Sequence, residues 1–299
     1  MTDLPLDQVW TLLAVVDEGT FDAAASTLHV TPSAVSQRVK ALEQRTGRVL
    51  LTRTKPVRAT ESGEVVVRFA RQLARLERDA RAELGMTGAG EPTRVSIAVN
   101  ADSLATWFLG ALTRLPAEPR LSFELRREDE DHTAALLREG QVMAAVTSSP
   151  DAVAGCSVRA LGRMRYLAVA SPAFAEEHRD GPLRDAPVVN FDRRDDFQDG
   201  FVRRLPGGEG GGHEGARPVR HFIPTSEGFA AAVAAGLGWG MLPEAQAVPL
   251  LRAGRLVQLA PERPVEVPLY WQQWKLDSPA LAAVADAVSA TAAETLRSW

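Results

Sequence analysis

The chain has a single cysteine, Cys156, among 299 residues, so it can form neither an internal disulfide nor a zinc site built from several cysteines. Its five histidines show no HExxH motif and no other paired spacing of metal ligands. The glycine-rich stretch from Gly207 to Gly215 lacks the Lys-Ser/Thr pair of a phosphate-binding loop, and we interpret it as a flexible surface loop. With no nucleophile–base pair to name, we expect no enzyme activity, no metal and no cofactor.

Long apolar runs are also missing. The run Phe229–Leu237 is too short to cross a bilayer, which takes about 20 apolar residues. The N-terminus carries no signal-peptide pattern. We therefore expect a soluble cytoplasmic protein without a membrane partner.

Residues 20–46 contain two short helical patterns separated by a tight break. The break holds His29, which tolerates a left-handed backbone, and Thr31-Pro32 then gives a helix cap followed by proline at the first helical position. The first pattern repeats apolar residues at i, i+3, i+4 and i+7, namely Phe21, Ala24, Ala25 and Leu28. This arrangement predicts a DNA-binding helix-turn-helix.

The second helix separates an apolar face from a polar one. Its apolar residues are Val35, Val39 and Leu42. A helix that presents small hydroxyls and an amide near its N-terminus can reach base edges in the major groove. The alternative is an ordinary solvated face on a helical bundle. The residues of this helix expected to contact DNA are Thr31, Pro32, Ser33, Ser36, Gln37, Arg38 and Lys40.

A basic segment follows the second helix. Gly47 ends the helix, and residues 49–55 and 56–60 are predicted to form two short strands around a turn that carries Arg53 and Lys55. Residues 36–58 hold seven Lys or Arg and one acid, although the whole chain has a formal charge of −4. Phosphate contacts need such a concentration of positive charge, so we interpret this segment as a wing that binds double-stranded DNA.

The order of these motifs, with TPSAVSQRVKALE followed by LLTRT and RATESG, resembles the LysR-type transcriptional regulators over residues 6–64. Downstream, the stretches from Val99 to Trp107 and from Ala186 to Asp192 resemble the ArgP/LysG branch. The resemblance implies a regulator that responds to lysine or arginine and controls export of a basic amino acid. It leaves RNA polymerase open as a further partner.

A long helix is predicted over residues 61–84, capped by Thr60. Its apolar residues recur at alternating spacings of three and four, which is typical of a two-stranded coiled coil. The alternative is a helix packed on its own domain. The resemblance favours a dimerisation helix and a homodimer or homotetramer. The predicted seam consists of Val66, Phe69, Leu73, Leu76 and Ala80.

Residues 93–299 alternate strand-like and helix-like stretches, which indicates parallel sheets with crossover helices. The predicted fold class is α/β with an all-α-type winged helix-turn-helix N-terminal domain. The resemblance implies an effector domain with two lobes, like a periplasmic binding protein. The expected segments are the DNA-binding domain 1–60, the linker helix 61–84, a hinge 85–92, lobe I (93–163 and 267–299) and lobe II (164–266).

Ligands of open α/β sheets bind beyond the carboxyl ends of the strands, beside helix N-termini. At these junctions we expect hydroxyls and amides to hold a carboxylate and acids to hold an ammonium or guanidinium group. Ser103 is expected to cap the helix after the first strand. The predicted effector-binding residues are Asn100, Asp102, Ser103, Glu128, Asp129, Thr147, Asp192 and Thr225.

Two alternatives remain open from the residues. The effector could be another small molecule, such as an aromatic acid or a different amino acid. The chain could also be an architectural DNA-binding protein with a solute-binding domain. A regulator should protect a short interrupted dyad near a promoter, whereas an architectural protein should coat DNA without a preferred site.

Overall fold

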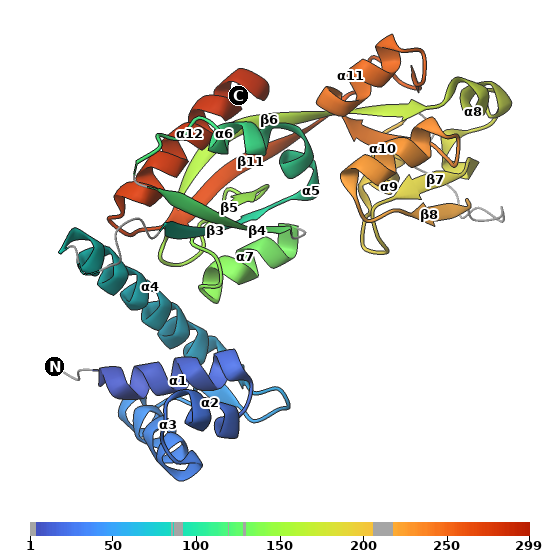
Figure 1. Cartoon of the computed structure of the whole chain (residues 1–299). Coiled ribbons are helices and arrows are strands. Elements are labelled where there is room, and N and C mark those ends of the chain that lie inside the picture. Colours follow the sequence, from blue (N-terminus) through green and yellow to red (C-terminus); the bar gives the residue numbers. More distant parts are fainter. Residues whose placement is uncertain (1–3, 85, 87–91, 119, 128–129, 206–217) are drawn as a thin grey trace.

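The computed structural model describes residues 4–84, 86, 92–118, 120–127, 130–205 and 218–299. Figure 1 shows a helical N-terminal domain, a long helix that leads away from it, and an α/β domain of two lobes. Most of the predicted hinge, the glycine-rich stretch and the acids Glu128 and Asp129 lie outside the described residues.

The helix-turn-helix forms where the sequence predicts it. The Thr31 hydroxyl accepts a hydrogen bond from the Ala34 amide at 3.2 Å, and Gly47 ends the helix with a φ of 65°. His29 occupies the turn with a φ of 54°, the left-handed backbone expected there. The elements are α1 (Leu6–Glu18), α2 (Phe21–Thr27), α3 (Pro32–Thr46) and the wing strands β1 (Leu51–Thr52) and β2 (Arg58–Ala59).

One hydrophobic core joins these helices to α4 (Glu61–Glu83). Val66, Val67 and Ala70 of α4 are buried together with the apolar faces of α1 and α3. The Thr60 hydroxyl caps α4 by accepting a hydrogen bond from the Gly63 amide at 3.1 Å. The N-terminal domain and the first half of α4 therefore form one packed unit.

The exposed apolar stripe of α4 differs from the predicted seam at one position. Val66 is 6% exposed and belongs to the core of the N-terminal domain, while its neighbour Val65 is 53% exposed. Assigning Val66 to the seam was wrong, because spacings of three and four do not distinguish which of two adjacent valines faces the domain. The rest of the predicted stripe is exposed or half-buried: Phe69, Leu73, Leu76 and Ala80.

Lobe I contains a mixed sheet in which β3 lies parallel to both β4 and β5. The helices pack against a core that includes Trp107, Phe108 and Trp271. Its strands are β3 (Thr93–Val99), β4 (Leu121–Arg127), β5 (Ala144–Thr147), and parts of β6 (Cys156–Ala170) and β11 (Val265–Trp274). Its helices are α5 (Ala101–Ser103), a π-helical turn (Leu104–Phe108), α6 (Leu109–Leu112), α7 (Glu130–Arg138) and α12 (Pro279–Thr295).

Lobe II is reached by two strands that run on from lobe I. β6 and β11 pair antiparallel from Cys156 opposite Trp274 to Tyr166 opposite Val265. The sequence pattern predicts strands only over residues 166–170 and 267–274. Both observed strands begin earlier, because their extra residues pair between β6 and β11. The remaining elements are α8 (Pro172–Glu177), a 3-10 turn (Leu183–Asp185), β7 (Val188–Asn190), α9 (Phe197–Arg203), β8 (Arg220–Phe222), α10 (Ser226–Ala234), β9 (Gly240–Pro243), α11 (Glu244–Arg252) and β10 (Val257–Gln258).

Candidate functional site

The N-terminal part of α3 presents a polar surface to solvent. Val35, Val39 and Leu42 point into the domain core, so the residues between them face outward. Arg38 is only partly exposed and lies 3.9 Å from the Asp7 carboxylate. The predicted DNA-contacting residues that are exposed on this helix and at its cap are Thr31, Pro32, Ser33, Ser36, Gln37 and Lys40.

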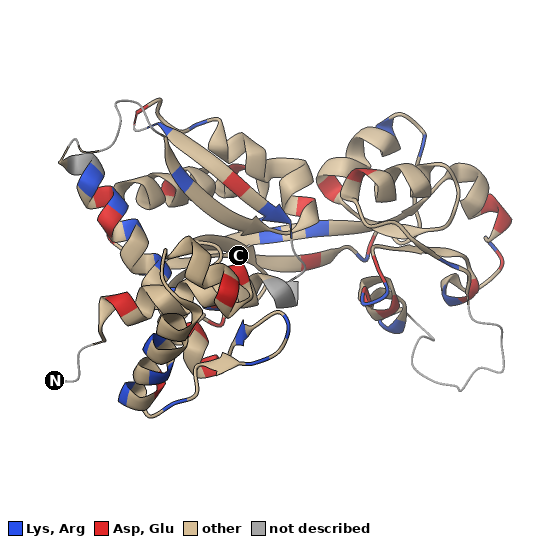
Figure 2. Cartoon of the chain, turned by 60° about the horizontal axis from the view of Figure 1, so that its bottom comes forward, with Lys and Arg blue, Asp and Glu red and all other residues tan. Residues whose placement is uncertain are grey.

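The wing adds positive charge next to this surface. Arg53, Lys55 and Arg58 are exposed on and around the β1–β2 hairpin. Figure 2 shows Lys and Arg positions along α3 and on this hairpin. The acid in the segment, Glu43, accepts hydrogen bonds from the amides of Leu50 (2.8 Å) and Leu51 (3.4 Å). Its carboxylate therefore holds the wing in place, and the exposed surface is basic.

A cavity of about 350 Å³ lies between the two lobes, a size that suits a small-molecule ligand. It opens at the carboxyl end of β3, where the sequence predicts the effector site. Lobe I contributes Asn100, Ala101, Asp102 and Val267. Lobe II contributes Tyr166, Phe191, Asp192, Arg194, Asp195, Asp196, Phe197, Gln198, Ser226, Phe229, Met241, Pro243 and Gln246.

Asp102 is held on the lobe I side of the cavity by two hydroxyls from lobe II. Tyr166 donates to one carboxylate oxygen at 2.8 Å, and Ser226 donates to the other at 2.6 Å. Burial raises the pKa of the Asp102 carboxyl, and the hydroxyls of Ser226 and Tyr166 oppose part of that rise. The nearby charge of Asp195 raises the pKa further. Among the described residues, the hydrogen-bonding partners of the Asp102 carboxylate are neutral hydroxyls, which leave its negative charge unbalanced.

Asp195 provides a second carboxylate from lobe II. Its oxygens accept hydrogen bonds from the amides of Phe191 at 2.7 Å and Phe197 at 3.0 Å. Burial raises the pKa of this carboxyl as well, and the two amides oppose the rise. Asp192 organises the same turn by accepting from the amides of Arg194 and Asp195. The cavity therefore has a carboxylate on each side.

The structure separates the predicted effector residues into two groups. Asn100, Asp102 and Asp192 line the cavity. Ser103, Thr147 and Thr225 do not belong to its lining. Glu128 and Asp129 lie outside the described residues, so their role in effector binding remains a prediction.

Local hydrogen bonding explains the positions of the three residues outside the lining. Asn100, not Ser103, caps the helix after β3: its side chain accepts from the Ser103 amide at 3.0 Å, and Ser103 is buried. The Thr147 hydroxyl accepts from Gln272 at 3.2 Å within lobe I. The Thr225 hydroxyl caps α10 by accepting from the Gly228 amide at 3.2 Å.

Sequence reasoning missed most of the lobe II wall. Tyr166 lies in a strand without any motif, and only the fold brings it to Asp102. Asp195 lies in the segment 192–196 after β7, from which the sequence analysis selects only Asp192. The sequence analysis predicts the correct strand–helix junction but selects the hydroxyl of Thr225, whereas the next residue, Ser226, lines the cavity.

No helix in the described part of the chain is both long and apolar enough to cross a membrane.

Comparison with known proteins agrees with this architecture. Residues 6–64 match the family described as "Bacterial regulatory helix-turn-helix protein, lysR family", and residues 88–293 match "LysR substrate binding domain". The "Lysine export transcriptional regulatory protein LysG" of Corynebacterium glutamicum is 46% identical over 293 residues, which cover 97% of this chain and 98% of that protein.

Two solved structures are similar over nearly the whole chain. The crystal structure of ArgP from Mycobacterium tuberculosis has a TM-score of 0.87 and 47% identity, and covers 98% of both chains. Full-length LysG from C. glutamicum with bound effector Arg has a TM-score of 0.85 and 44% identity, and covers 98% of this chain and 99% of that one. With a basic helix-turn-helix surface at one end, a cavity between two lobes at the other and both family matches in sequence, this chain belongs to the LysR family of bacterial DNA-binding transcriptional regulators and is not an enzyme.

Proposed function

We propose that this regulator responds to a basic amino acid, arginine or lysine, bound in the interlobe cavity, and that it controls genes for amino-acid export or metabolism. The relative from C. glutamicum whose solved structure contains Arg, and whose name refers to lysine export, supports this proposal. It would act in the cytoplasm as a homo-oligomer bound to double-stranded DNA.

The observation that carries the proposal is the pair of carboxylates on opposite sides of one cavity. Asp102 comes from lobe I and Asp195 from lobe II. Burial raises the pKa of both carboxyls, and the charge of Asp195 raises that of Asp102 further. A ligand cation placed between them would offset the cost of two partly buried negative charges. Charge-assisted hydrogen bonds to both lobes would also favour the closed arrangement.

The rest of the lining suits the other parts of such a ligand. Arg194 is the cationic residue of the lining, and a guanidinium is well matched to a carboxylate. Phe191, Phe197 and Phe229 provide apolar wall, against which an aliphatic stem can lie. Among the described residues of the lining, one cation and several acids favour a ligand of net positive charge.

Calorimetry on the full-length protein tests the effector. Arginine and lysine should bind, whereas citrulline, which replaces the guanidinium by a neutral group of similar shape, should bind at least about tenfold more weakly because one charge-assisted hydrogen bond contributes about 1.5–3 kcal/mol. Norleucine serves as the neutral counterpart of lysine. Citrulline binding as tightly as arginine would exclude charge recognition by the cavity acids.

Gene control is tested with DNA. The regulator should protect a short interrupted dyad upstream of a gene for an amino-acid exporter or a related enzyme, and arginine or lysine should alter that footprint. A footprint that is unaffected by both amino acids, on a dyad the protein binds tightly, would contradict their role as effectors.

A further inference from the structure

A second face of α4 is docked against lobe I through arginines. Arg68, Arg71 and Arg75 lie at i, i+3 and i+7, on one side of the helix. Arg68 is 9% exposed and Arg75 is 5% exposed, and arginine is almost never this buried unless its donors are satisfied. Arg75 donates to the carbonyl of Arg94 on β3 at 2.7 Å, which fixes the later half of α4 on lobe I.

The partners of the other two arginines are carbonyls at the C-terminal end of α7. Arg68 donates to the Arg138 carbonyl at 2.8 Å, and Arg71 donates to the Glu139 carbonyl at 2.6 Å. The last carbonyls of a helix lack donors within it and carry its negative dipole end, so two guanidinium groups stabilise this terminus. Gly140 permits the close approach: its φ is 71°, and a Cβ there would lie 3.1 Å from the Arg68 Cα.

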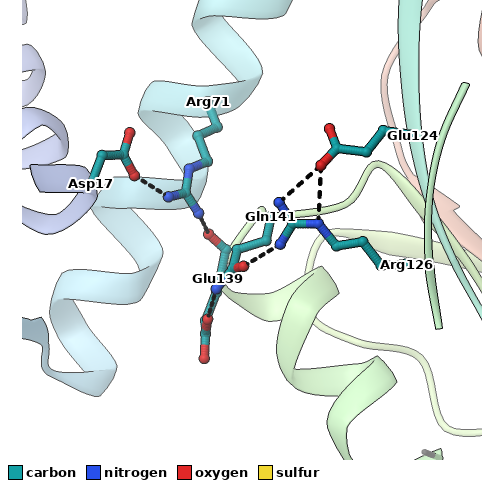
Figure 3. Close-up of polar contacts among 6 residues, drawn as sticks. All are labelled: Asp17, Arg71, Glu124, Arg126, Glu139 and Gln141. Carbon is teal, nitrogen blue, oxygen red and sulfur yellow. Dashed lines mark hydrogen bonds and ion pairs between the residues drawn. The ribbon is translucent and has the colours of Figure 1, made fainter. Parts of the chain in front are cut away.

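Arg71 also reaches the N-terminal domain. While its Nη1 donates to Glu139, its Nη2 pairs with the carboxylate of Asp17 near the end of α1 (Figure 3). The planar fork of a guanidinium can serve two acceptors in fixed directions, whereas the ammonium of lysine is a point charge. One side chain therefore connects the N-terminal domain, α4 and lobe I.

We call the contacts of Arg71 with Asp17 and Glu139 the joint, and hydrogen bonds continue from it to β4. The Gln141 amide donates to the Glu139 carboxylate, and its oxygen accepts from Arg126 at 2.5 Å (Figure 3). Arg126 also donates to Glu124 on the same strand at 3.3 and 3.4 Å. The penultimate residue of β4 is thus part of the joint.

The last residue of β4 touches lobe II. Arg127 donates to the Pro224 carbonyl at 2.6 Å, and its guanidinium carbon lies 5.7 Å from the centroid of the Phe191 ring. Phe191 lines the cavity. Because successive residues of a strand face opposite sides, the end of β4 contacts lobe II with Arg127 and the joint with Arg126.

We propose that Arg71 is a positioning residue for DNA binding, which holds the unit of N-terminal domain and α4 in a set orientation on lobe I. The end of β4 links this joint to the cavity, so that a movement of lobe II at Phe191 reaches Arg126 and then Gln141. An effector in the cavity changes the affinity for DNA through these contacts. The inference that Arg71 couples the cavity to DNA binding rests on the proposed function, whereas the inference that Arg71 fixes the orientation does not.

The coupling is measured with full-length protein and a duplex selected from random sequences. In Arg71→Ala, arginine should bind the DNA-free protein as tightly as it binds wild type. The factor by which arginine changes the affinity for DNA should fall toward one. The factor by which DNA changes the affinity for arginine should fall equally, because the two factors are the same by linkage. Arg71→Lys should retain part of the factor. Arg78→Ala, at an exposed arginine of the same helix, should leave it unchanged. If arginine changed the DNA affinity of Arg71→Ala by the same factor as that of wild type, the proposed coupling would be overturned.

The orientation is measured without any effector. Spin labels on Gln44→Cys of α3 and Ala282→Cys of α12, both exposed positions, report the distance between the two parts. Burial raises the pKa of the native Cys156 thiol to about 11, so this thiol stays unlabelled at neutral pH. Excess unlabelled protein keeps one labelled chain in each oligomer.

The distance distribution should be narrow in the wild-type background and with Arg78→Ala, and broad with Arg71→Ala. Asp17→Ala should broaden it as well, and the double variant should add little, because the two residues share one contact. A narrow distribution in Arg71→Ala would overturn the positioning role. If arginine fails to bind the wild-type protein, the proposed effector is wrong. The distance distribution still tests whether Arg71 fixes the orientation of the N-terminal domain on lobe I.

Discussion

At the scale of single residues, Asp102 shows how one side chain can contact the opposite lobe and still attract a cation. Its burial is tolerated because Tyr166 and Ser226 donate to its carboxylate from the other lobe. These neutral donors satisfy its oxygens without cancelling its charge, so a cation still gains from approaching. Asp102 can therefore hold the lobes near each other and yet remain attractive to a basic ligand.

Replacing Asp102 by asparagine tests this role. We expect Asp102→Asn to weaken arginine binding by about 1.5–3 kcal/mol, the contribution of a charge-assisted hydrogen bond, while citrulline binding changes little. Calorimetry gives both values, and Asp286→Asn, at an exposed acid of lobe I, serves as the control. An equal loss for arginine and citrulline would indicate a distorted cavity instead of a lost charge.

The pH dependence follows from the same carboxyl. Its pKa is raised in the folded protein, so the native state holds this proton more tightly than the unfolded chain does. Its contribution to stability is largest below the unfolded pKa and declines as pH rises through the folded pKa. Arginine binding has the opposite sign, because it needs the ionised carboxylate. Arginine affinity should fall as pH is lowered through the raised pKa, and less steeply in Asp102→Asn.

Two residues of the DNA-binding surface should behave differently. Gln37→Ala should relax sequence preference, since an amide on a base edge contributes about 1–3 kcal/mol of discrimination. Arg53→Ala should weaken binding to all sequences and reduce the salt dependence by about one phosphate contact. Binding to selected and random duplexes over a salt series separates the two effects. An unchanged ratio of specific to random affinity in Gln37→Ala would remove Gln37 from the reading face.

At the scale of elements, α4 carries apolar side chains that its own chain leaves accessible. Val65, Phe69 and Leu76 are 53%, 40% and 43% exposed. Leu73 lies between them on the same stripe. Pairing with a second copy of α4 would bury this stripe, which is the arrangement expected of a dimerisation helix.

A charge in the stripe should separate the protomers. We expect Leu73→Asp to abolish dimers, because burying an unpaired carboxylate costs several kcal/mol, while the effector domain stays folded. Sedimentation at micromolar concentration measures the mass, and circular dichroism checks the fold. Arg78→Asp puts the same side chain at an exposed position off the stripe and should remain dimeric. A dimeric Leu73→Asp would exclude this stripe as the interface.

Local signals determined which elements the sequence could predict. Capping residues and periodicity located α2, α3 and α4, because Thr31, Gly47 and Thr60 act within a few residues of themselves. The full length of β6 and the helix α11 were not predicted. β6 depends on pairing with β11, about a hundred residues away, and Pro249 in the middle of α11 argues against a helix.

The candidate site also contains some residues that local sequence patterns predict and others that they do not. Asn100 and Asp102 were predicted, since ligand sites lie at the ends of parallel strands. Tyr166 and Asp195 were not singled out, because their place on the opposite wall depends on how two lobes close, which no local pattern records. Ser103 was expected to cap its helix, but the preceding Asn100 already provides the oxygen.

At the scale of the whole molecule, the two lobes also meet through side chains outside the cavity lining. Arg127 is one of them, since it spans from the end of β4 in lobe I to Pro224 and Phe191 in lobe II. This contact can form only while the lobes are close. A ligand that contacts both walls therefore binds more tightly when such a contact is present, because the contact offsets part of the free-energy cost of bringing the lobes together.

Removing this contact should weaken effector binding without touching the ligand's charge recognition. We expect Arg127→Ala to raise the arginine Kd about fivefold, as an exposed cation–π contact and one exposed hydrogen bond together contribute about 1 kcal/mol. Lysine and citrulline should weaken by the same factor, since the loss lies in lobe closure and not in a ligand group. Calorimetry with the three ligands measures this, and Arg252→Ala, at an exposed arginine of lobe II, is the matched control. A loss confined to arginine would instead place Arg127 in direct contact with the ligand, and unchanged affinities would show that the lobes close without it.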